Sequence, residues 1–283
     1  MSSGVLEQGH GYLVGVGRLR IHYRAWEVQT PRAAIVVVHG LGEHSGRYDE
    51  FASAMAGYGF SSYALDLRGH GSSEGRRGHV ARFEILLQEL DRFRREVQGL
   101  VDPSCPLFLL GHSMGGLVVL RYLEEYDSPY RGAIVVSPWL ATALPAPRWK
   151  IALSGFCSRF LPALPFSTKV RGKDVSHDQA VVEAYDSDPL VHDTITPRLF
   201  AEAETAMALV FQRAERLRVP LLFLLAGDDH VVDTQRSLAF ARSLPAHDVT
   251  VRIYPGLYHE VLNELDRHAV RAELRDWLVK HLR

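Results

Sequence analysis

The sequence predicts an α/β fold in which helices cover both faces of a mostly parallel sheet. Short apolar runs, several of them rich in β-branched residues, alternate along the chain with longer segments that have the spacing of amphipathic helices. Several runs are apolar at every position, which is typical of parallel strands buried on both faces. The 283 residues are enough for one large domain or for a core domain with an insertion.

The predicted elements follow one another in the order expected of a doubly wound sheet. The first strand, over residues 18–26, alternates polar and apolar side chains as an antiparallel edge strand does. The later strands are compact and apolar, and we expect them over residues 33–40, 60–67, 106–113, 132–138, 220–229 and 249–256. Helical spacing predicts helices over residues 47–59, 81–100, 114–126, 234–244 and 264–282.

One region breaks this alternation and indicates an insertion. It begins with a stretch rich in Pro, Leu, Phe and Trp that is almost free of acidic residues. We expect a helical cap over residues 138–205, inserted in a core formed by residues 1–137 and 206–283. Its apolar side chains either pack on the core, or line a tunnel or contact a lipid surface. The residues concerned are Trp139, Leu140, Trp149, Phe156, Phe160 and Leu161.

Composition excludes several classes of protein. A hydrophobic content of 47% and a charged content of 23% are typical of a soluble globular protein. A net charge of −1 gives no reason to expect nucleic acid as a partner, and two cysteines cannot form a disulfide framework. The N-terminus lacks the pattern of a signal peptide, and no apolar run reaches the roughly 18 residues of a membrane span. We therefore expect a soluble, cytoplasmic protein.

A serine between glycines marks the candidate site. Residues 111–115, GHSMG, fit the pattern G-x-S-x-G and lie between a predicted strand and a predicted helix. The turn holds Ser113 in a strained backbone conformation, and glycine at 111 and 115 avoids the crowding that a Cβ would cause. A glycine-rich packing turn is the alternative. A phosphate-binding loop does not fit, because the segment has neither a Walker lysine nor G-x-G-x-x-G spacing.

A serine hydroxyl needs a base and an acid that orients the base. In this arrangement the acid and then the histidine follow the serine along the chain. Asp228, Asp229 and Asp233 are the candidates for the acid after a late strand. We select Asp229, which stands just before a short apolar return, whereas Asp228 could shape the turn. His259 follows the last predicted strand and is the candidate base.

The candidate oxyanion hole needs two backbone N–H donors. Met114, directly after the serine, supplies one, and Leu41 in the loop after an early strand supplies the other. Gly40 and Gly42 allow that loop to turn toward the site, and we expect His39 to stabilise the turn. The other histidines are scattered without H-E-x-x-H or a cysteine cluster, so we expect no metal site.

The motifs together resemble the monoacylglycerol lipase family of α/β-hydrolases, especially its bacterial, lysophospholipase-like branch. The resemblance covers nearly the whole chain. It rests on HGLGEHSGRY (39–48), YALDLRGHGSSEG (63–75), GHSMGG (111–116), YDSDPLVH (185–192), GDDHVVD (227–233) and YPGLYHEVLNE (254–264). It implies the α/β-hydrolase fold, with a helical cap over the active site.

The resemblance also implies roles for individual residues. Ser113 would be the nucleophile, Asp229 the acid and His259 the base, with Leu41 and Met114 as oxyanion donors. In a separate group, Glu43 and Arg47 match positions that help to form the polar, glycerol-facing end of the pocket. A structural ion pair that braces the loop is the alternative for these two. We place Trp139 and Leu140 of the cap at the substrate as well.

The implied reaction is hydrolysis of a monoacylglycerol to a fatty acid and glycerol through an acyl-enzyme, without metal or organic cofactor. A broader carboxylesterase or lysophospholipase is the enzymatic alternative, and a hydrolase-fold binding protein is the alternative from another class. A peptidase is disfavoured because the cap has no acidic cluster for a substrate amino terminus. The implied partners are a lipid ester and, through the cap, transiently a membrane surface.

Overall fold

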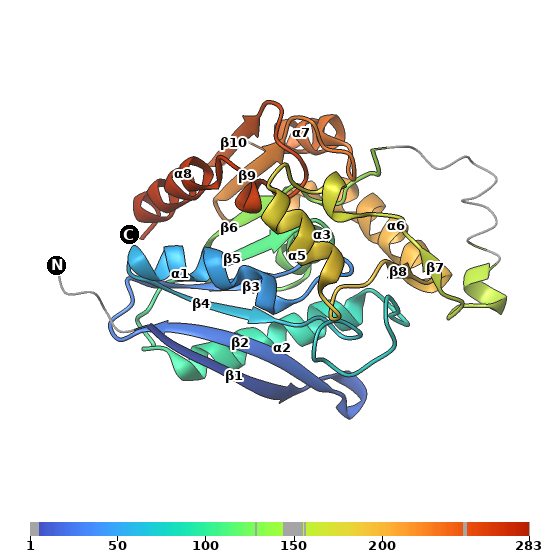
Figure 1. Ribbon diagram of the computed structural model, residues 1–283. Coiled ribbons are helices and arrows are strands. Elements are labelled where there is room, and N and C mark those ends of the chain that lie inside the picture. The colour runs from blue at the N-terminus through green and yellow to red at the C-terminus, as the bar shows by residue number, and fades with distance from the viewer. Residues whose placement is uncertain (1–5, 128, 144–154, 156, 246–247, 283) are drawn as a thin grey trace.

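The computed structural model describes residues 6–127, 129–143, 155, 157–245 and 248–282 (Figure 1). Within these residues one eight-stranded sheet has the order β1-β2-β4-β3-β5-β6-β9-β10. Its strands are β1 (Leu6–Val14), β2 (Arg20–Val28), β3 (Ala33–Val38), β4 (Phe60–Leu65), β5 (Leu107–His112), β6 (Tyr130–Val136), β9 (Leu221–Ala226) and β10 (Val249–Tyr254). Only β2 runs antiparallel to its neighbours β1 and β4, and every pair from β4 to β10 is parallel.

The predicted edge strand is not at the edge. β1 pairs with the full length of β2, from Leu6 opposite Val28 to Val14 opposite Arg20, and it takes the edge position itself. The expectation of an edge strand over residues 18–26 is therefore wrong. Alternation of polar and apolar residues does not distinguish an edge strand from an inner antiparallel strand. In β2 both faces contribute to the core, because Ile21 and Ala25 pack in one hydrophobic cluster and Trp26 packs in the other.

Helices cover the two faces of the sheet, which explains the wholly apolar strands. α1 (Asp49–Gly57) and α8 (Arg267–Lys280) lie on one face, and α2 (Glu84–Leu100), α3 (Met114–Glu125) and α7 (Thr234–Ser243) lie on the other (Figure 1). Along β3, Ile35 and Val37 pack in the cluster that contains α1 and α8, whereas Val36 and Val38 pack in the cluster of α2 and α3. The α/β fold class is confirmed.

The segment between β6 and β9 contains α5 (Gln179–Ser187), α6 (Pro197–Gln212) and the small antiparallel pair β7 (Phe166–Ser167) and β8 (Thr194–Ile195). Trp149 and Phe156 of the predicted cap lie outside the described residues. α6 continues seven residues beyond 205, the expected end of the cap, because its buried side chains Leu199, Ala203, Ala206, Met207 and Val210 form one continuous face on the core.

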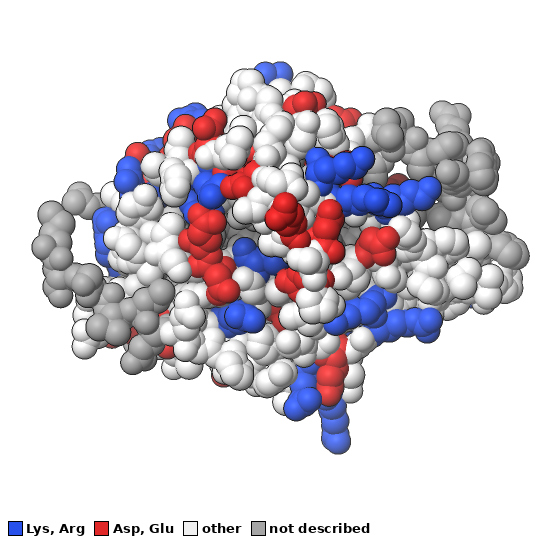
Figure 2. Space-filling model, in the orientation of Figure 1, with Lys and Arg blue, Asp and Glu red and all other residues white. Residues whose placement is uncertain are grey.

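The structure also describes helical residues at 157–160 and five short 3₁₀ helices: η1 (Val16–Arg18), η2 (Ser45–Tyr48), η3 (Gly172–Asp174), η4 (Ala214–Arg216) and η5 (Val261–Asn263). No helix among the described residues has the length and apolar character needed to cross a membrane. On the face drawn in Figure 2, basic and acidic side chains are interspersed rather than separated by sign.

Candidate active site

Ser113 occupies a sharp turn between β5 and α3. Its φ of 53° lies in the left-handed region, which is strained for any residue other than glycine. A Cβ at Gly111 would lie 2.4 Å from the Gly115 carbonyl oxygen, and one at Gly115 would lie 2.1 Å from the Val38 carbonyl oxygen. Both motif glycines are thus needed for the close approach of β3, β5 and α3. The strain holds the serine side chain at the carboxyl ends of the parallel strands, where α/β sheets bind ligands.

Asp229 and His259 meet at the ends of β9 and β10. The Asp229 Oδ2 atom lies 2.8 Å from the His259 Nδ1 atom, and both side chains are buried. The other oxygen, Oδ1, accepts hydrogen bonds from the backbone N–H groups of Val231 and Val232 at 2.8 and 2.9 Å. Burial raises the pKa of Asp229, but the charge and hydrogen bond of His259, together with these N–H groups, outweigh it and leave the pKa below its usual value.

The two competing aspartates lie elsewhere. The Asp228 side chain is 60% exposed and its Oδ1 atom is 3.4 Å from Nε2 of His230. Asp233 caps α7, because its carboxylate accepts a hydrogen bond from the Arg236 backbone N–H. Of the three aspartates considered in the sequence, the fold brings only Asp229 to His259.

The loop after β3 approaches the serine closely. A Cβ on Gly40 would lie 3.1 Å from the Ser113 Cβ. Among the described residues, the backbone N–H groups of Leu41 and Met114 have no hydrogen-bond acceptor, so both are available to donate to a bound group. His39 supports the turn: its Nε2 atom accepts a hydrogen bond from the Leu67 N–H at 2.9 Å, so its Nδ1 atom donates to the Gly40 carbonyl oxygen at 2.7 Å.

A buried charge network lies behind the site. The Glu43 carboxylate accepts hydrogen bonds from the Gly40 N–H at 2.6 Å and from Nη1 of Arg47 at 3.3 Å, and it lies 2.7 Å from Nδ1 of His112. Arg47 also donates two hydrogen bonds to Glu260, at 2.5 and 2.9 Å. Burial alone would raise the pKa of Glu43, but His112 and Arg47 outweigh it and hold this pKa well below its usual value.

Three residues in or beside this charge network, His112, Glu260 and Tyr185, were not predicted from the sequence as site residues. His112 occupies one of the two variable positions of GHSMG, and Glu260 directly follows His259. Both are therefore next to residues that the sequence predicts as catalytic. The guanidinium carbon of Arg47 lies 4.7 Å from the centroid of the Tyr185 ring, and Tyr185 is the first residue of the YDSDPLVH motif, to which the sequence assigned no role. The contacts join η2, the loop that carries His259 and α5, which are distant along the chain.

Replacing Arg47 with methionine is expected to lower the free energy of unfolding by about 3–5 kcal/mol, because the buried carboxylates Glu43 and Glu260 lose their shared cation. The matched control is Arg20→Met, since the Arg20 side chain is 66% exposed and its pair with the exposed Glu74 should contribute little to stability. Equilibrium urea unfolding of both variants measures the difference. Equal effects would contradict a structural role for the buried network.

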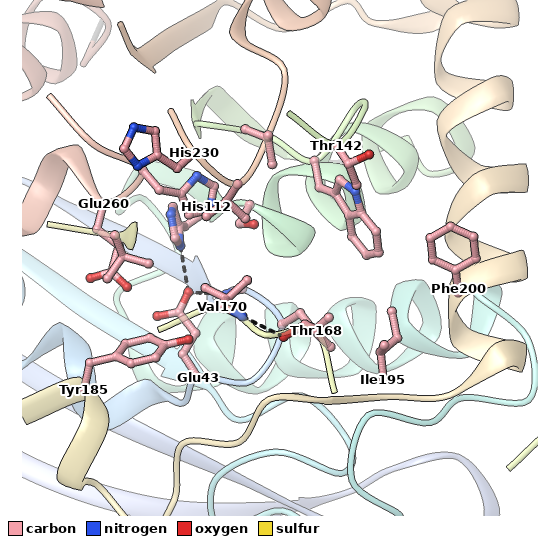
Figure 3. Close-up of a pocket in the computed structure, with 18 residues that line it drawn as sticks. Glu43, His112, Thr142, Thr168, Val170, Tyr185, Ile195, Phe200, His230 and Glu260 are labelled. Carbon is pink, nitrogen blue, oxygen red and sulfur yellow. Dashed lines mark hydrogen bonds and ion pairs between the residues drawn. The ribbon is translucent and has the colours of Figure 1, made fainter. Parts of the chain in front are cut away.

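Ser113 and His259 line one cavity of about 360 Å³ (Figure 3). Its polar end is formed by Glu43, His112, Tyr185 and Glu260, and its other end by the apolar side chains of Ile195 and Phe200. Trp139 also lines the cavity, with its ring centroid 6.4 Å from that of Phe200. Of the four predicted substrate contacts, Glu43 and Trp139 line this cavity. Arg47 contacts it only through lining residues, and Leu140 lines a neighbouring cavity. Within the described part of the chain, no group of three His, Cys, Asp or Glu side chains is arranged to hold a metal ion.

The sheet order, the strained serine between strand and helix, and the Asp–His pair on the last two strands define an α/β-hydrolase of the serine type. A family described as "Serine aminopeptidase, S33" matches residues 29–266. Monoacylglycerol lipase of Mycolicibacterium smegmatis is 34% identical over 95% of this chain and 96% of that protein. Monoglyceride lipase of Rattus norvegicus is 32% identical over 94% of this chain and 89% of that protein.

Solved structures agree with these relatives. The crystal structure of Paleococcus ferrophilus monoacylglycerol lipase has a TM-score of 0.82 and 32% identity, and the match covers 98% of this chain and 99% of that one. A soluble variant of the Saccharomyces cerevisiae monoglyceride lipase, with a TM-score of 0.84 and 23% identity, shares the fold over 99% of this chain and 96% of that one. The chain belongs to the serine aminopeptidase S33 family and, within it, to the monoacylglycerol lipase family of carboxylic ester hydrolases, which confirms the resemblance seen in the motifs.

Proposed function

We propose that this protein hydrolyses monoacylglycerols to a fatty acid and glycerol. The observation that carries the proposal is the place of Ser113 in a cavity with one polar and one apolar end. Such a cavity suits an ester whose acyl chain lies on one side of the reacting carbon and whose polyol lies on the other. The names and similarity of the relatives support the same substrate class.

In the proposed mechanism, Asp229 holds the His259 ring so that Nε2 faces the serine. His259 accepts the Ser113 proton while Oγ attacks the ester carbonyl carbon, and the backbone N–H groups of Leu41 and Met114 stabilise the oxyanion. His259 then donates the proton to the glycerol oxygen as the carbon–oxygen bond breaks. Water, deprotonated by the same histidine, attacks the acyl carbon. The bond from that carbon to Ser113 Oγ then breaks, His259 returns the proton to Oγ, and the fatty acid is released. No cofactor enters these steps.

The polar end favours glycerol over a phosphate-containing head group. Glu43 and Glu260 present carboxylates, and no Lys or Arg side chain is among the described residues that line the cavity. Proteins usually recognise phosphate with Arg or Lys. The same carboxylates are already paired, Glu260 with Arg47 and Glu43 with both Arg47 and His112, so neither is free to pair with the ammonium group of a peptide substrate. These contacts disfavour the lysophospholipase and aminopeptidase alternatives.

We expect kcat/KM for monolauroylglycerol to exceed that for lauroyl-lysophosphatidylcholine by at least about tenfold, a difference of roughly 1.4 kcal/mol in transition-state binding. Both substrates are presented in the same detergent micelles, with p-nitrophenyl laurate as a control for general esterase activity and leucine p-nitroanilide for aminopeptidase activity. Equal rates on both lipids would favour the broader esterase. Absence of hydrolysis, together with no labelling of Ser113 by a fluorophosphonate, would favour a binding protein.

We also propose a transient contact between the cap and a lipid surface. Phe160, Leu161, Leu164 and Phe166 are large apolar side chains between about two fifths and three fifths exposed. Phe160→Ser combined with Leu161→Ser should reduce co-sedimentation with phosphatidylcholine vesicles, because less apolar area enters the interface. Val14→Ser, at an exposed position on β1, is the matched control. Equal binding by all three proteins would contradict this contact.

A further inference from the structure

A second cavity adjoins the apolar end of the catalytic cavity. Its volume is about 380 Å³, close to the 360 Å³ of the catalytic one. The two cavities have two lining residues in common, Thr142 and Phe200. These residues therefore form the wall between them. On the far side of the wall the second cavity is lined partly by the apolar side chains of Leu140, Met207 and Phe211. The charged residues Glu204, Asp233 and Arg236 line the rest of it.

The backbone part of this wall is held firmly. Thr142 forms an isolated antiparallel bridge with Val232. On either side of it, the Ala143 N–H donates to the Val231 carbonyl oxygen at 3.1 Å, and the Asp233 N–H donates to the Ala141 carbonyl oxygen at 3.0 Å. Because Val231 and Val232 also donate to Asp229, this strip of backbone belongs to the catalytic loop. The wall can therefore be opened without disturbing this backbone only by changing a side chain.

Phe200 supplies that side chain from the first turn of α6. Thr196 caps this helix, since its side chain accepts a hydrogen bond from the Leu199 N–H at 3.3 Å, and the Phe200 N–H donates to the Thr196 carbonyl oxygen at 3.0 Å. The Phe200 ring is half-buried, and its centroid lies 6.4 Å from that of Trp139. The backbone anchors fix the place of the ring without depending on its size.

The ring stands at the end of the catalytic cavity that is remote from the polar groups. Figure 3 shows Phe200 on α6 beyond Ile195 and Thr142, with Glu43, Tyr185 and Glu260 at the opposite end. If the alcohol part of the ester faces those polar groups, the acyl chain extends from Ser113 toward Phe200. The terminal carbons of a long chain then meet the ring, and the space behind it is closed to them.

We propose that Phe200 sets the upper limit of acyl-chain length, and that the second cavity extends the acyl site once this ring is removed. The inference rests on the proposed ester hydrolysis, because it assumes that the apolar end holds the acyl chain. It assigns chain-length selection to one side chain in the cap and gives the second cavity a defined ligand, the distal part of a fatty acyl chain.

The test is an internal competition between two esters with the same alcohol. The p-nitrophenyl esters of C8 and C16 acids are mixed in one detergent micelle, and mass spectrometry of the released acids gives the ratio of their kcat/KM values. Phe200→Ala should raise the C16-to-C8 ratio by at least about tenfold, because the added methylenes gain contact with the apolar side chains of Leu140, Met207 and Phe211. Phe211→Ala, the same truncation on the far side of the wall, should leave the ratio at the wild-type value.

Filling the second cavity tests whether the effect of Phe200→Ala can be reversed. Ala208 lines only the second cavity, so Ala208→Trp should occupy its space without touching the catalytic cavity. In the Phe200→Ala background this change should restore the wild-type ratio, whereas in the otherwise wild-type chain it should have no effect. A smaller opening, Phe200→Leu, should shift the ratio in the same direction as Phe200→Ala and keeps the test available if the alanine variant does not fold.

An unchanged ratio in folded Phe200→Ala or Phe200→Leu would overturn the inference, as would a raised ratio that Ala208→Trp fails to reverse. These outcomes are distinct from failure of the proposed function. If the wild-type chain hydrolyses neither ester, ester hydrolysis itself is refuted. If hydrolysis proceeds with the same chain-length ratio in every variant, only the role of Phe200 is refuted.

Discussion

Ser113→Ala is expected to lower kcat for ester hydrolysis by at least about 10⁴-fold, because no other group can form the acyl-enzyme and the triad acts as a unit. Turnover of p-nitrophenyl laurate measures the loss, and labelling by a fluorophosphonate should disappear with it. Ser113→Gly should show the same loss without lower thermal stability, since glycine adopts the φ of 53° without strain.

Ser62→Ala is the control for this prediction. The Ser62 side chain is buried in β4, and its Oγ atom has no hydrogen-bond partner among the described residues. Its removal should leave both turnover and labelling at the wild-type level. Turnover by Ser113→Ala within tenfold of the wild type would refute the nucleophile and, with it, the acyl-enzyme mechanism.

Asp229→Asn is expected to lower kcat by about 10⁴-fold. The asparagine oxygen can keep the hydrogen bonds from the Val231 and Val232 N–H groups, which directs its NH₂ group toward Nδ1 of His259. That nitrogen must then act as acceptor, so the ring proton moves to Nε2, the atom that has to take the proton of Ser113. The side chain keeps its size while the base is held in the wrong tautomer.

The matched control is Asp228→Asn, one residue away in the same loop. Because Asp228 is largely exposed and faces His230, its kcat should stay within about threefold of the wild type, as is usual for a surface substitution away from the site. Steady-state turnover of one ester by both variants decides between the two aspartates. A large loss in Asp228→Asn with little loss in Asp229→Asn would assign the acid to Asp228.

Strong local patterns account for what could be predicted of the fold. The wholly apolar run of β3 indicates a strand that is buried on both faces, and this prediction needs only the residues of the run itself. β1 was missed although it pairs with all of β2, because glycines at 9 and 11 weaken its strand pattern. The expected cap boundary at residue 205 falls inside α6, since a helix end is set by its caps and packing rather than by a change in composition.

Part of the candidate site could likewise be predicted from local sequence, whereas another part depends on the tertiary structure. The turn at GHSMG could be predicted from its local sequence, because the two glycines relieve crowding within five residues of the chain. The bond between Asp229 and His259 joins β9 and β10, and the choice between two adjacent aspartates depends on which one the loop turns toward His259. Adjacent residues point to different sides of a turn, so neither composition nor spacing distinguishes them.

By itself, the sequence determined the fold class, the nucleophile turn and the order of the three candidate catalytic residues, because each depends on periodicity or on residues close together in the chain. Only the tertiary structure decided that Glu260 shares Arg47 with Glu43, and that Phe200 stands between two cavities. Arg47 and Glu260 are 213 residues apart along the chain, and Thr142 and Phe200, which line both cavities, are 58 residues apart. Sheet order and helix packing set the distances between these side chains, and neither can be deduced from any one segment of the chain.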